Sequence, residues 1–256
     1  MNPVSAAIRR TTAGGPALVA YLTAGFPRRE GFLEQLASVA RAADVVEIGV
    51  PFSDPMADGP TIQRASRAAL AGGVTLRWLL AELAAARSQF TTPLLLMSYF
   101  NPLLAFGLEA LPACARHAGV AGFIVPDLPL EESSGLSSAL AREQLSLVQF
   151  VAAATPAERA ARLCAASGGF VYALTTTGVT GQDVALPDAT LGWLGALRRT
   201  SPVPVCAGFG IRHRAQVERL APHVDGVIVG SALVEAIERG EDAGGFLQEL
   251  RPQRAA

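Results

Sequence analysis

The chain has 256 residues, half of them hydrophobic, and carries a formal net charge of -1 at pH 7. A near-neutral chain without a basic stripe or an acidic tail is not expected to have nucleic acid or a membrane surface as its main partner. All 21 basic side chains are arginines, so chemistry that forms a Schiff base on a lysine is excluded.

Three cysteines and three histidines are scattered along the chain without the spacing of a metal site. The cysteines are expected to be small buried residues of a reducing compartment. The amino terminus has no apolar stretch typical of a signal peptide, and no apolar run approaches the length of a membrane span. We therefore expect a cytoplasmic protein with no bound metal.

Short apolar runs along the chain predict eight buried β-strands. The runs are residues 17–22, 45–48, 94–98, 122–125, 147–151, 170–174, 203–207 and 226–229. Continuous apolar strands indicate burial on both faces, as in a parallel sheet covered by helices.

Helical segments with apolar residues at three- and four-residue spacing alternate with these runs. They are residues 30–42, 76–89, 108–117, 130–143, 156–167, 189–200 and 212–221. In one of them, Thr155 is predicted to be the N-cap and Pro156 the first helical residue.

Eight strands that alternate with helices predict a parallel (β/α)8 TIM barrel, with extra short helices at the amino terminus and in the loop after the second strand. A doubly wound open sheet is the alternative, but no Gly-x-Gly-x-x-Gly pattern follows the first strand. Because no linker or shift of composition is evident, residues 1–256 are predicted to form a single domain.

Two acidic residues are candidate catalytic groups, because a barrel has its active site at the carboxyl ends of its strands. Glu47 lies inside the apolar second strand. If its side chain points into the barrel mouth, desolvation raises its pKa and suits it to proton transfer. The alternative is a structural Glu paired with a buried Arg or with backbone donors. Asp58 in the following loop can converge on the same substrate, or equally be the N-cap of a helix.

Glycine-rich turns follow the last two predicted strands, at Gly208-Phe209-Gly210 and Gly230-Ser231. Glycine lets the backbone approach a ligand, and free N–H groups at the start of a helix bind anions. Since barrels commonly bind phosphate with these two loops, we predict a phosphate site formed by these two turns together.

An apolar pocket and a lid are predicted beside these groups. Residues 175–189 are rich in Thr and Gly, which is typical of a mobile lid that excludes water, although a plain solvated loop is the alternative. The side chains that can line the pocket, each of which also suits the core, are Tyr21, Met97, Ile124 and Phe209.

The segment EIGVPFSDPMADGPTIQ at residues 47–63 resembles the tryptophan synthase α subunit family, and the run is long and specific. The resemblance covers nearly the whole chain. It continues through YLTAG (21–25), MSYFNP (97–102), PDLP (126–129), TGVTG (177–181), GFGI (208–211) and GS (230–231).

This resemblance implies a carbon–carbon lyase that splits indole-3-glycerol phosphate into indole and glyceraldehyde 3-phosphate in tryptophan biosynthesis. Glu47 matches the general acid/base of the family, and Asp58 matches the carboxylate that accepts the indole N–H. Thr180 matches a lid residue that meets this Asp on closure. The implied substrate-binding residues are Tyr21, Met97, Tyr99, Ile124, Tyr172, Thr180 and Phe209, and the implied phosphate-binding residues are Gly181, Gly210, Gly230 and Ser231.

The implied retro-aldol reaction is chemically consistent with these residues. Glu47 can protonate indole C3 and then take the proton of the glycerol hydroxyl, while ionised Asp58 stabilises positive charge at the indole nitrogen. No metal or organic cofactor is needed. Two positions depart from the family: Tyr21 stands where Phe is frequent, and Thr176 stands where some members have Arg.

The resemblance also implies a tryptophan synthase β subunit as partner in an α2β2 heterotetramer. The positions that match the partner-facing residues of the family are Pro51, Asp54, Pro55, Asn101 and Asp127. A stand-alone lyase that releases free indole is the alternative. A binding partner with little activity of its own is a third reading, which intact Glu47 and Asp58 disfavour.

Overall fold

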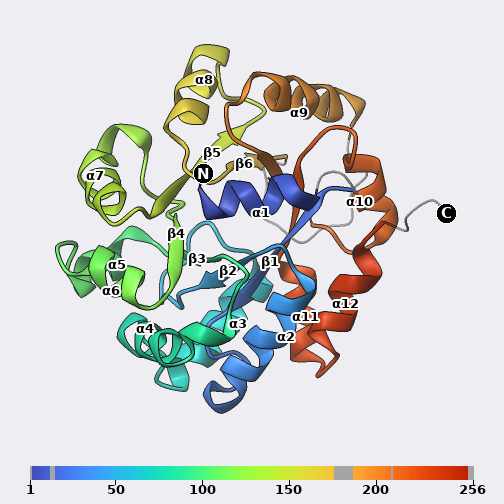
Figure 1. Cartoon of the computed structure of the whole chain (residues 1–256). Coiled ribbons are helices and arrows are strands. Elements are labelled where there is room, and N and C mark those ends of the chain that lie inside the picture. Colours follow the sequence, from blue (N-terminus) through green and yellow to red (C-terminus); the bar gives the residue numbers. More distant parts are fainter. Residues whose placement is uncertain (1, 12–14, 176–186, 209, 253–256) are drawn as a thin grey trace.

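The computed structural model describes residues 2–11, 15–175, 187–208 and 210–252. Eight parallel strands in these residues close a barrel in which each strand pairs with the next and β8 pairs with β1 (Figure 1). The strands are β1 Ala17–Thr23, β2 Val45–Gly49, β3 Leu94–Met97, β4 Val120–Ile124, β5 Ser146–Ala152, β6 Val171–Leu174, β7 Val205–Gly208 and β8 Gly226–Val229.

Helices connect the strands and surround the barrel (Figure 1). The α-helices are α1 Pro3–Thr11, α2 Phe32–Ala42, α3 Pro60–Ala71, α4 Leu76–Ala85, α5 Phe100–Phe106, α6 Leu111–His117, α7 Ser134–Arg142, α8 Ala157–Ala166, α9 Asp188–Thr200, α10 Arg214–Leu220, α11 Ser231–Glu238 and α12 Ala243–Leu250. Short 3-10 helices are η1 Arg29–Gly31, η2 Arg87–Gln89 and η3 Leu130–Glu132.

The predicted TIM barrel is confirmed, and all eight predicted strands are present within a few residues of their expected bounds. The extra helices are α1 at the amino terminus and α3 in the connection from β2 to β3. The predicted N-cap at Thr155 is wrong, because α8 begins at Ala157 and the Thr155 hydroxyl instead accepts a hydrogen bond from Ala152 N at 3.1 Å. The expected burial holds for Cys164 and Cys206, whereas Cys114 is exposed.

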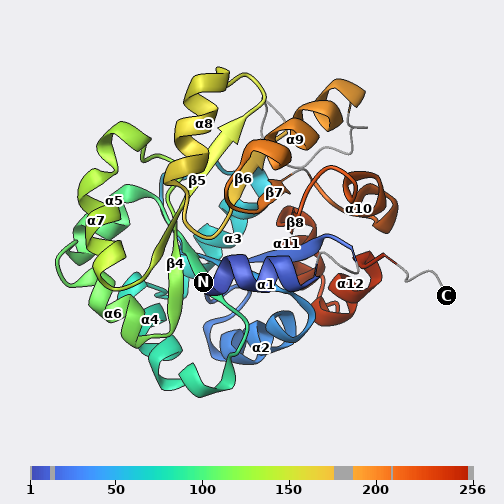
Figure 2. The ribbon, with the colours of Figure 1, turned by 45° about the horizontal axis from the view of Figure 1, so that its top comes forward.

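Two hydrophobic clusters explain why the strands are apolar on both faces. The larger cluster fills the space between the barrel and its helices. The smaller one lies inside the barrel, where Val19, Val45 and Leu95 pack with Val4 and Ile8 of α1. Helix α1 therefore closes the amino-terminal end of the barrel (Figure 2).

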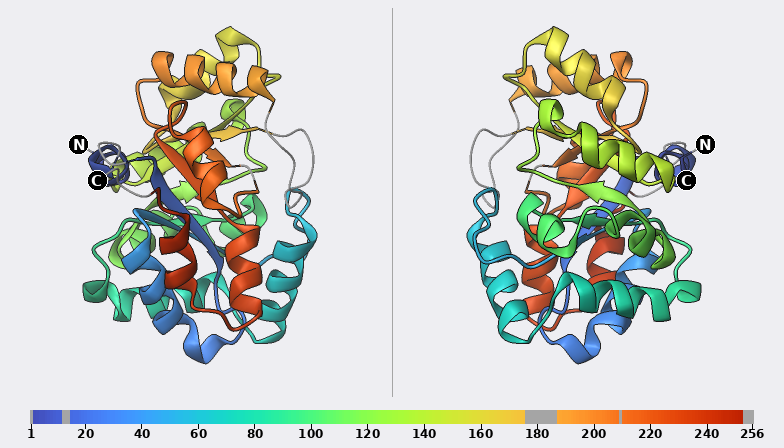
Figure 3. Two further views of the ribbon diagram at one scale, coloured as in Figure 1. Left: turned by 90° about the vertical axis from the view of Figure 1, so that its right-hand side faces the viewer. Right: turned by 90° about the vertical axis from the view of Figure 1, so that its left-hand side faces the viewer.

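The opposite end of the barrel is left for the carboxyl ends of the strands and the loops that follow them. Figure 3 shows α1 at one end of the molecule and α3 toward the other. In the ranges given above, no single helix is long and apolar enough to cross a membrane. The bent pair α3 and α4, at 82°, meets that test by length and composition alone.

Candidate active site

Glu47 is the most deeply buried acidic residue of the site, with no exposed surface. It lies in the middle of β2, paired in register with Tyr21 of β1 and Leu95 of β3. Within the described part of the chain, neither of its carboxyl oxygens has a hydrogen-bond partner. Burial raises the pKa of Glu47 to about 8. In the described residues, Glu47 therefore lacks the arginine or backbone partner that the alternative of a structurally paired Glu requires.

Two tyrosine rings lie beside glycines of neighbouring strands at this end of the barrel. A Cβ atom at Gly49 would lie 2.1 Å from the Tyr21 hydroxyl, and one at Gly208 would lie 2.6 Å from the Tyr172 ring. Any larger residue at either position would displace its tyrosine. Tyr21 stands where similar sequences often have Phe. Its hydroxyl lies 3.4 Å from Thr23 Oγ1, so this position carries a polar atom inside the barrel.

Asp58 is held in the loop between β2 and α3. The Tyr99 hydroxyl accepts a hydrogen bond from Ala57 N at 2.8 Å and donates one to the Asp58 carboxylate. Gln63 Nε2 donates to the Asp58 carbonyl at 2.9 Å. Helix α3 has Gly59 as its N-cap and Pro60 at its start, so the alternative of Asp58 as an N-cap is wrong.

The carboxyl groups of Glu47 and Asp58 both influence the pKa values of two buried tyrosines, Tyr21 and Tyr172. Burial raises the pKa of Asp58 to about 6, although the hydrogen bond from Tyr99 opposes this rise. Burial is also the main reason why the pKa values of Tyr21 and Tyr172 are raised, and the charges of both Glu47 and Asp58 raise them further. Glu47 and Asp58 therefore both lie near Tyr21 and Tyr172.

Apolar side chains from β3 to β6 form the wall opposite β1 and β2. Met97 is partly exposed and pairs in register with Ile124, which is fully buried in the barrel interior. Phe150 of β5 lies with its ring 4.8 Å from that of Tyr172, and our sequence analysis missed it. Its signal was available, because Phe150 follows the interior residue Val148 by two positions in a strand with alternating faces.

Three of the predicted phosphate residues, Gly210, Gly230 and Ser231, lie in the turns after β7 and β8. Gly208 pairs in register with Ile228, so Gly210 and Gly230 each lie two residues beyond a paired position. Gly210 has φ +42, which favours glycine. Gly230 is the N-cap of α11 and Ser231 its first residue, and among the described residues no side chain caps this helix start, as suits an anion site. Thr180, Gly181, Phe209 and most of the predicted lid lie outside the described residues.

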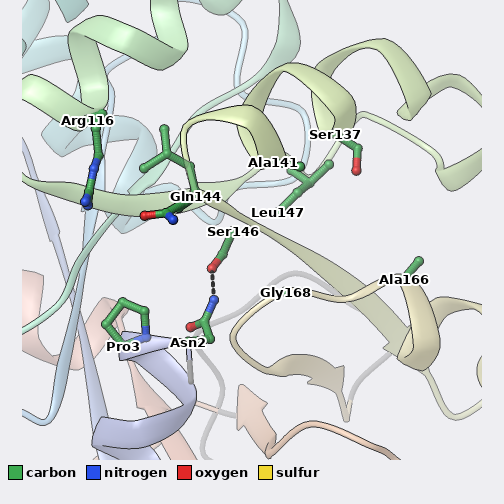
Figure 4. Close-up of a pocket in the computed structure, with 11 residues that line it drawn as sticks. Asn2, Pro3, Arg116, Ser137, Ala141, Gln144, Ser146, Leu147, Ala166 and Gly168 are labelled. Carbon is green, nitrogen blue, oxygen red and sulfur yellow. Dashed lines mark hydrogen bonds between the residues drawn. The ribbon is translucent and has the colours of Figure 1, made fainter.

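A cavity of about 620 Å³ lies at the other end of the strands and contains none of the predicted site residues. Asn2 Nδ2 donates to Ser146 Oγ at 2.6 Å across it, and Arg116 and Gln144 lie at its edge (Figure 4). Both of these edge side chains are exposed. Over the ranges that the structure describes, no three His, Cys, Asp or Glu residues are grouped to hold a metal ion.

The closed barrel, its two carboxyl groups of unequal pKa and the glycine-rich turns after β7 and β8 define an enzyme of the (β/α)8-barrel class. A family model described as Tryptophan synthase alpha chain matches residues 8–253. This chain therefore belongs to the tryptophan synthase alpha chain family and is an enzyme of the lyase class.

Individual relatives agree with this assignment. A tryptophan synthase alpha chain from Solidesulfovibrio magneticus is 45% identical over 240 residues, covering 93% of this chain and 94% of that protein. One from Chloroflexus aurantiacus is 43% identical, covering 90% and 88%. Among solved structures, tryptophan synthase of Mycobacterium tuberculosis has a TM-score of 0.88 and 37% identity, and each chain is covered to 98%. The subunit alpha structure from Legionella pneumophila has a TM-score of 0.84 and 32% identity, with coverage of 98% and 97%.

The raised pKa of Glu47 predicts a pH-dependent stability. Between the ordinary pKa of 4.5 and the folded value of about 8, the folded chain keeps a proton that the unfolded chain has released. The free energy of unfolding should therefore fall as the pH rises through this range. Glu47→Gln cannot ionise and should lose this component, so it should gain Tm relative to the wild type between pH 5 and pH 9. Parallel curves of Tm against pH for the two proteins would contradict the raised pKa of Glu47.

Proposed function

We propose that this chain cleaves indole-3-glycerol phosphate to indole and glyceraldehyde 3-phosphate, as the α subunit of a tryptophan synthase in tryptophan biosynthesis. The observation that carries the proposal is the fully buried carboxyl group of Glu47, which has no hydrogen-bond partner in the described residues and lies, like Asp58, near Tyr172. Membership of the tryptophan synthase alpha chain family supports the same reaction. We also propose a cytoplasmic location, as expected for a biosynthetic enzyme with free cysteines.

The difference in pKa between Glu47 and Asp58 assigns their roles. At neutral pH, Glu47 with a pKa of about 8 holds its proton, whereas Asp58 with a pKa of about 6 is mostly ionised. Glu47 donates its proton to C3 of the indole ring, and Asp58 stabilises the positive charge that this creates at the ring nitrogen.

The bond between indole C3 and the glycerol chain then breaks. The glycerol hydroxyl next to this bond gives its proton to the carboxylate that Glu47 has become, and its oxygen becomes the aldehyde oxygen of the product. The electron pair of the broken bond returns to the indole ring and neutralises it. Glu47 ends the cycle protonated, and no cofactor takes part.

The surrounding side chains position the two halves of the substrate. Tyr21, Met97, Ile124 and Tyr172 form the apolar side of the space that would hold the indole ring, and Tyr99 orients Asp58. A Cβ built on Gly230 would lie 3.8 Å from Tyr21 Cβ, so the phosphate end of the proposed site adjoins the indole end. Thr180, Gly181 and Phe209 complete the proposed set.

Replacing the proposed proton donor tests the reaction directly. Glu47→Gln keeps the size of the side chain but cannot donate or accept the proton, and general acid–base groups contribute roughly 10²–10⁴-fold. We expect indole formation from indole-3-glycerol phosphate to fall by at least about 100-fold while the circular dichroism spectrum stays that of the wild type. A variant that keeps more than about a tenth of the wild-type turnover would exclude this role, since the expected loss is larger.

The turns after β7 and β8 form the proposed phosphate cradle. A charge placed in this cradle tests the second half of the site. A Cβ at Gly230 makes only ordinary contact, at 3.8 Å from Tyr21 Cβ. Gly230→Asp should therefore fold and mainly raise the KM for the phosphorylated substrate, because a carboxylate repels phosphate. Gly230→Ala is the matched control and should raise the KM far less. Equal KM values for the two variants would place the anion site elsewhere.

The proposed β subunit would dock on the loops around Asp58. Met56 at the tip of this loop is 89% exposed, which is unusual for a large apolar side chain, and Asp54 and Asn101 are exposed beside it. Two of the matched positions fit this role less well. Pro51 is buried, and the Asp127 carboxylate accepts hydrogen bonds from Phe100 N at 2.9 and 3.2 Å.

If the loop that carries Asp58 is mobile in the free chain, docking of a β subunit should raise the activity by favouring the ordered form of this loop. A partner that binds the ordered loop shifts its population and adds no catalytic group, so a competent fraction of about 1% would allow at most a hundredfold rise. Titration with a β subunit should therefore increase indole release. Asp54→Ala should reduce this increase more than it reduces the basal rate. A wild-type chain that is already fast alone and does not respond would instead be a stand-alone lyase.

A further inference from the structure

The carboxylate of Glu235 lies outside the proposed site. It joins three segments of the chain that each carry residues of that site. Glu235 of α11 accepts two hydrogen bonds from the Arg212 guanidinium, at 2.7 and 3.1 Å. It also accepts one from the Thr61 hydroxyl of α3, at 3.0 Å. The side chains of Glu235 and Arg212 are only 22% and 26% exposed, so water screens this pair little.

Each of these three residues lies close in sequence to a residue of the proposed site. Thr61 is the second residue of α3 and follows Asp58 by three positions. Arg212 follows Gly210 by two positions, and Glu235 lies one helical turn beyond Ser231 in α11. Helices α3 and α11 lie side by side in Figure 3. A shift of Glu235 would therefore move the Asp58 loop and both turns of the phosphate cradle relative to one another.

A second ion pair between the same helices lacks this connection. Arg64 and Glu238 lie three residues further along α3 and α11, with Arg64 Nη2 3.2 Å from Glu238 Oε2. Their side chains are 48% and 42% exposed, and in the described residues neither forms a hydrogen bond or ion pair with the turn after β7. This pair joins the two helices without joining them to Gly210, and so provides a matched control.

We propose that Glu235 is a positioning residue that couples phosphate binding in the cradle to the placement of Asp58. The proposal rests on the proposed function, because it concerns the same site. A phosphate bound by the turns after β7 and β8 holds Arg212 and α11 in place. Through Glu235 and Thr61 this fixes the first turn of α3, and with it the loop that carries Asp58. Such coupling is reciprocal, so an ordered Asp58 loop also favours phosphate binding.

Hydrogen–deuterium exchange with glycerol 3-phosphate as the probe tests the coupling without any turnover. In the wild type, the probe should slow exchange both in the first turn of α11 and in residues 57–63. Thr61→Val keeps the shape of the side chain but removes its hydroxyl, so protection should remain in α11 and disappear from residues 57–63. Glu235→Gln should lose most of the protection in both segments, and Glu238→Gln should behave as the wild type.

Steady-state kinetics add a readout that a purely structural role would not move. Removing a hydrogen bond to a charged group changes an equilibrium by roughly 10-fold or more. Glu235→Gln should therefore lower kcat/KM by about 10-fold, mainly through KM. Thr61→Val should lower kcat more than it raises KM. Glu238→Gln should stay within about twofold of the wild type, as expected for an exposed ion pair.

The outcomes separate this proposal from the proposed function. Protection of residues 57–63 that survives in Thr61→Val and Glu235→Gln, or that is absent from the wild type, overturns the coupling. Equal kcat and KM values for Glu235→Gln and Glu238→Gln, at equal Tm, would also overturn the coupling. A wild type that shows the exchange pattern but forms no indole would overturn the proposed function and leave the coupling in place.

Discussion

The burial of one carboxyl group inside the barrel is the constraint on which the rest of the site depends. The strand pairing places Glu47 between Tyr21 and Leu95 on the interior face, and α1 closes the other end of the barrel with apolar side chains. Within the described residues no arginine and no hydrogen-bond donor reaches the carboxyl group. An ionised carboxylate is strongly disfavoured in such surroundings, so the group keeps its proton to about pH 8.

Asp58 shows how a second carboxyl group near the same tyrosines acquires a different protonation state. Its loop gives it partial exposure and a hydrogen bond from the Tyr99 hydroxyl, and both favour the ionised form. Pairs of ionisable groups whose surroundings separate their pKa values are typical of acid–base catalysis. The division between a proton donor and a charge-stabilising carboxylate thus arises from where β2 ends and its loop begins, and from the anchoring of that loop by Tyr99 and Gln63.

Sequence reasoning predicted the features that depend on local pattern and missed those that depend on distant contacts. Apolar runs marked all eight strands, because a barrel strand is buried on both faces. The same reasoning did not predict α5, whose first N–H group is bound by Asp127, 27 positions away in sequence. It placed Thr155 as a cap by local chemistry, whereas the hydroxyl bonds back to the end of β5. For Glu47 and Asp58 it left two readings open: the start of α3 excludes the N-cap reading of Asp58, and in the described residues Glu47 has no hydrogen-bond partner.

The protonation state of Glu47 is the central claim, and it can be measured in the free protein. The protein would be prepared with ¹³C-labelled glutamate, and the Glu47 carboxyl resonance would be assigned by its loss in Glu47→Gln and followed by NMR through a pH titration. The account predicts a midpoint of about 8, far above the ordinary 4.5. A midpoint near 4.5 would show that the buried carboxylate is ionised at neutral pH, and would contradict its role as the proton donor.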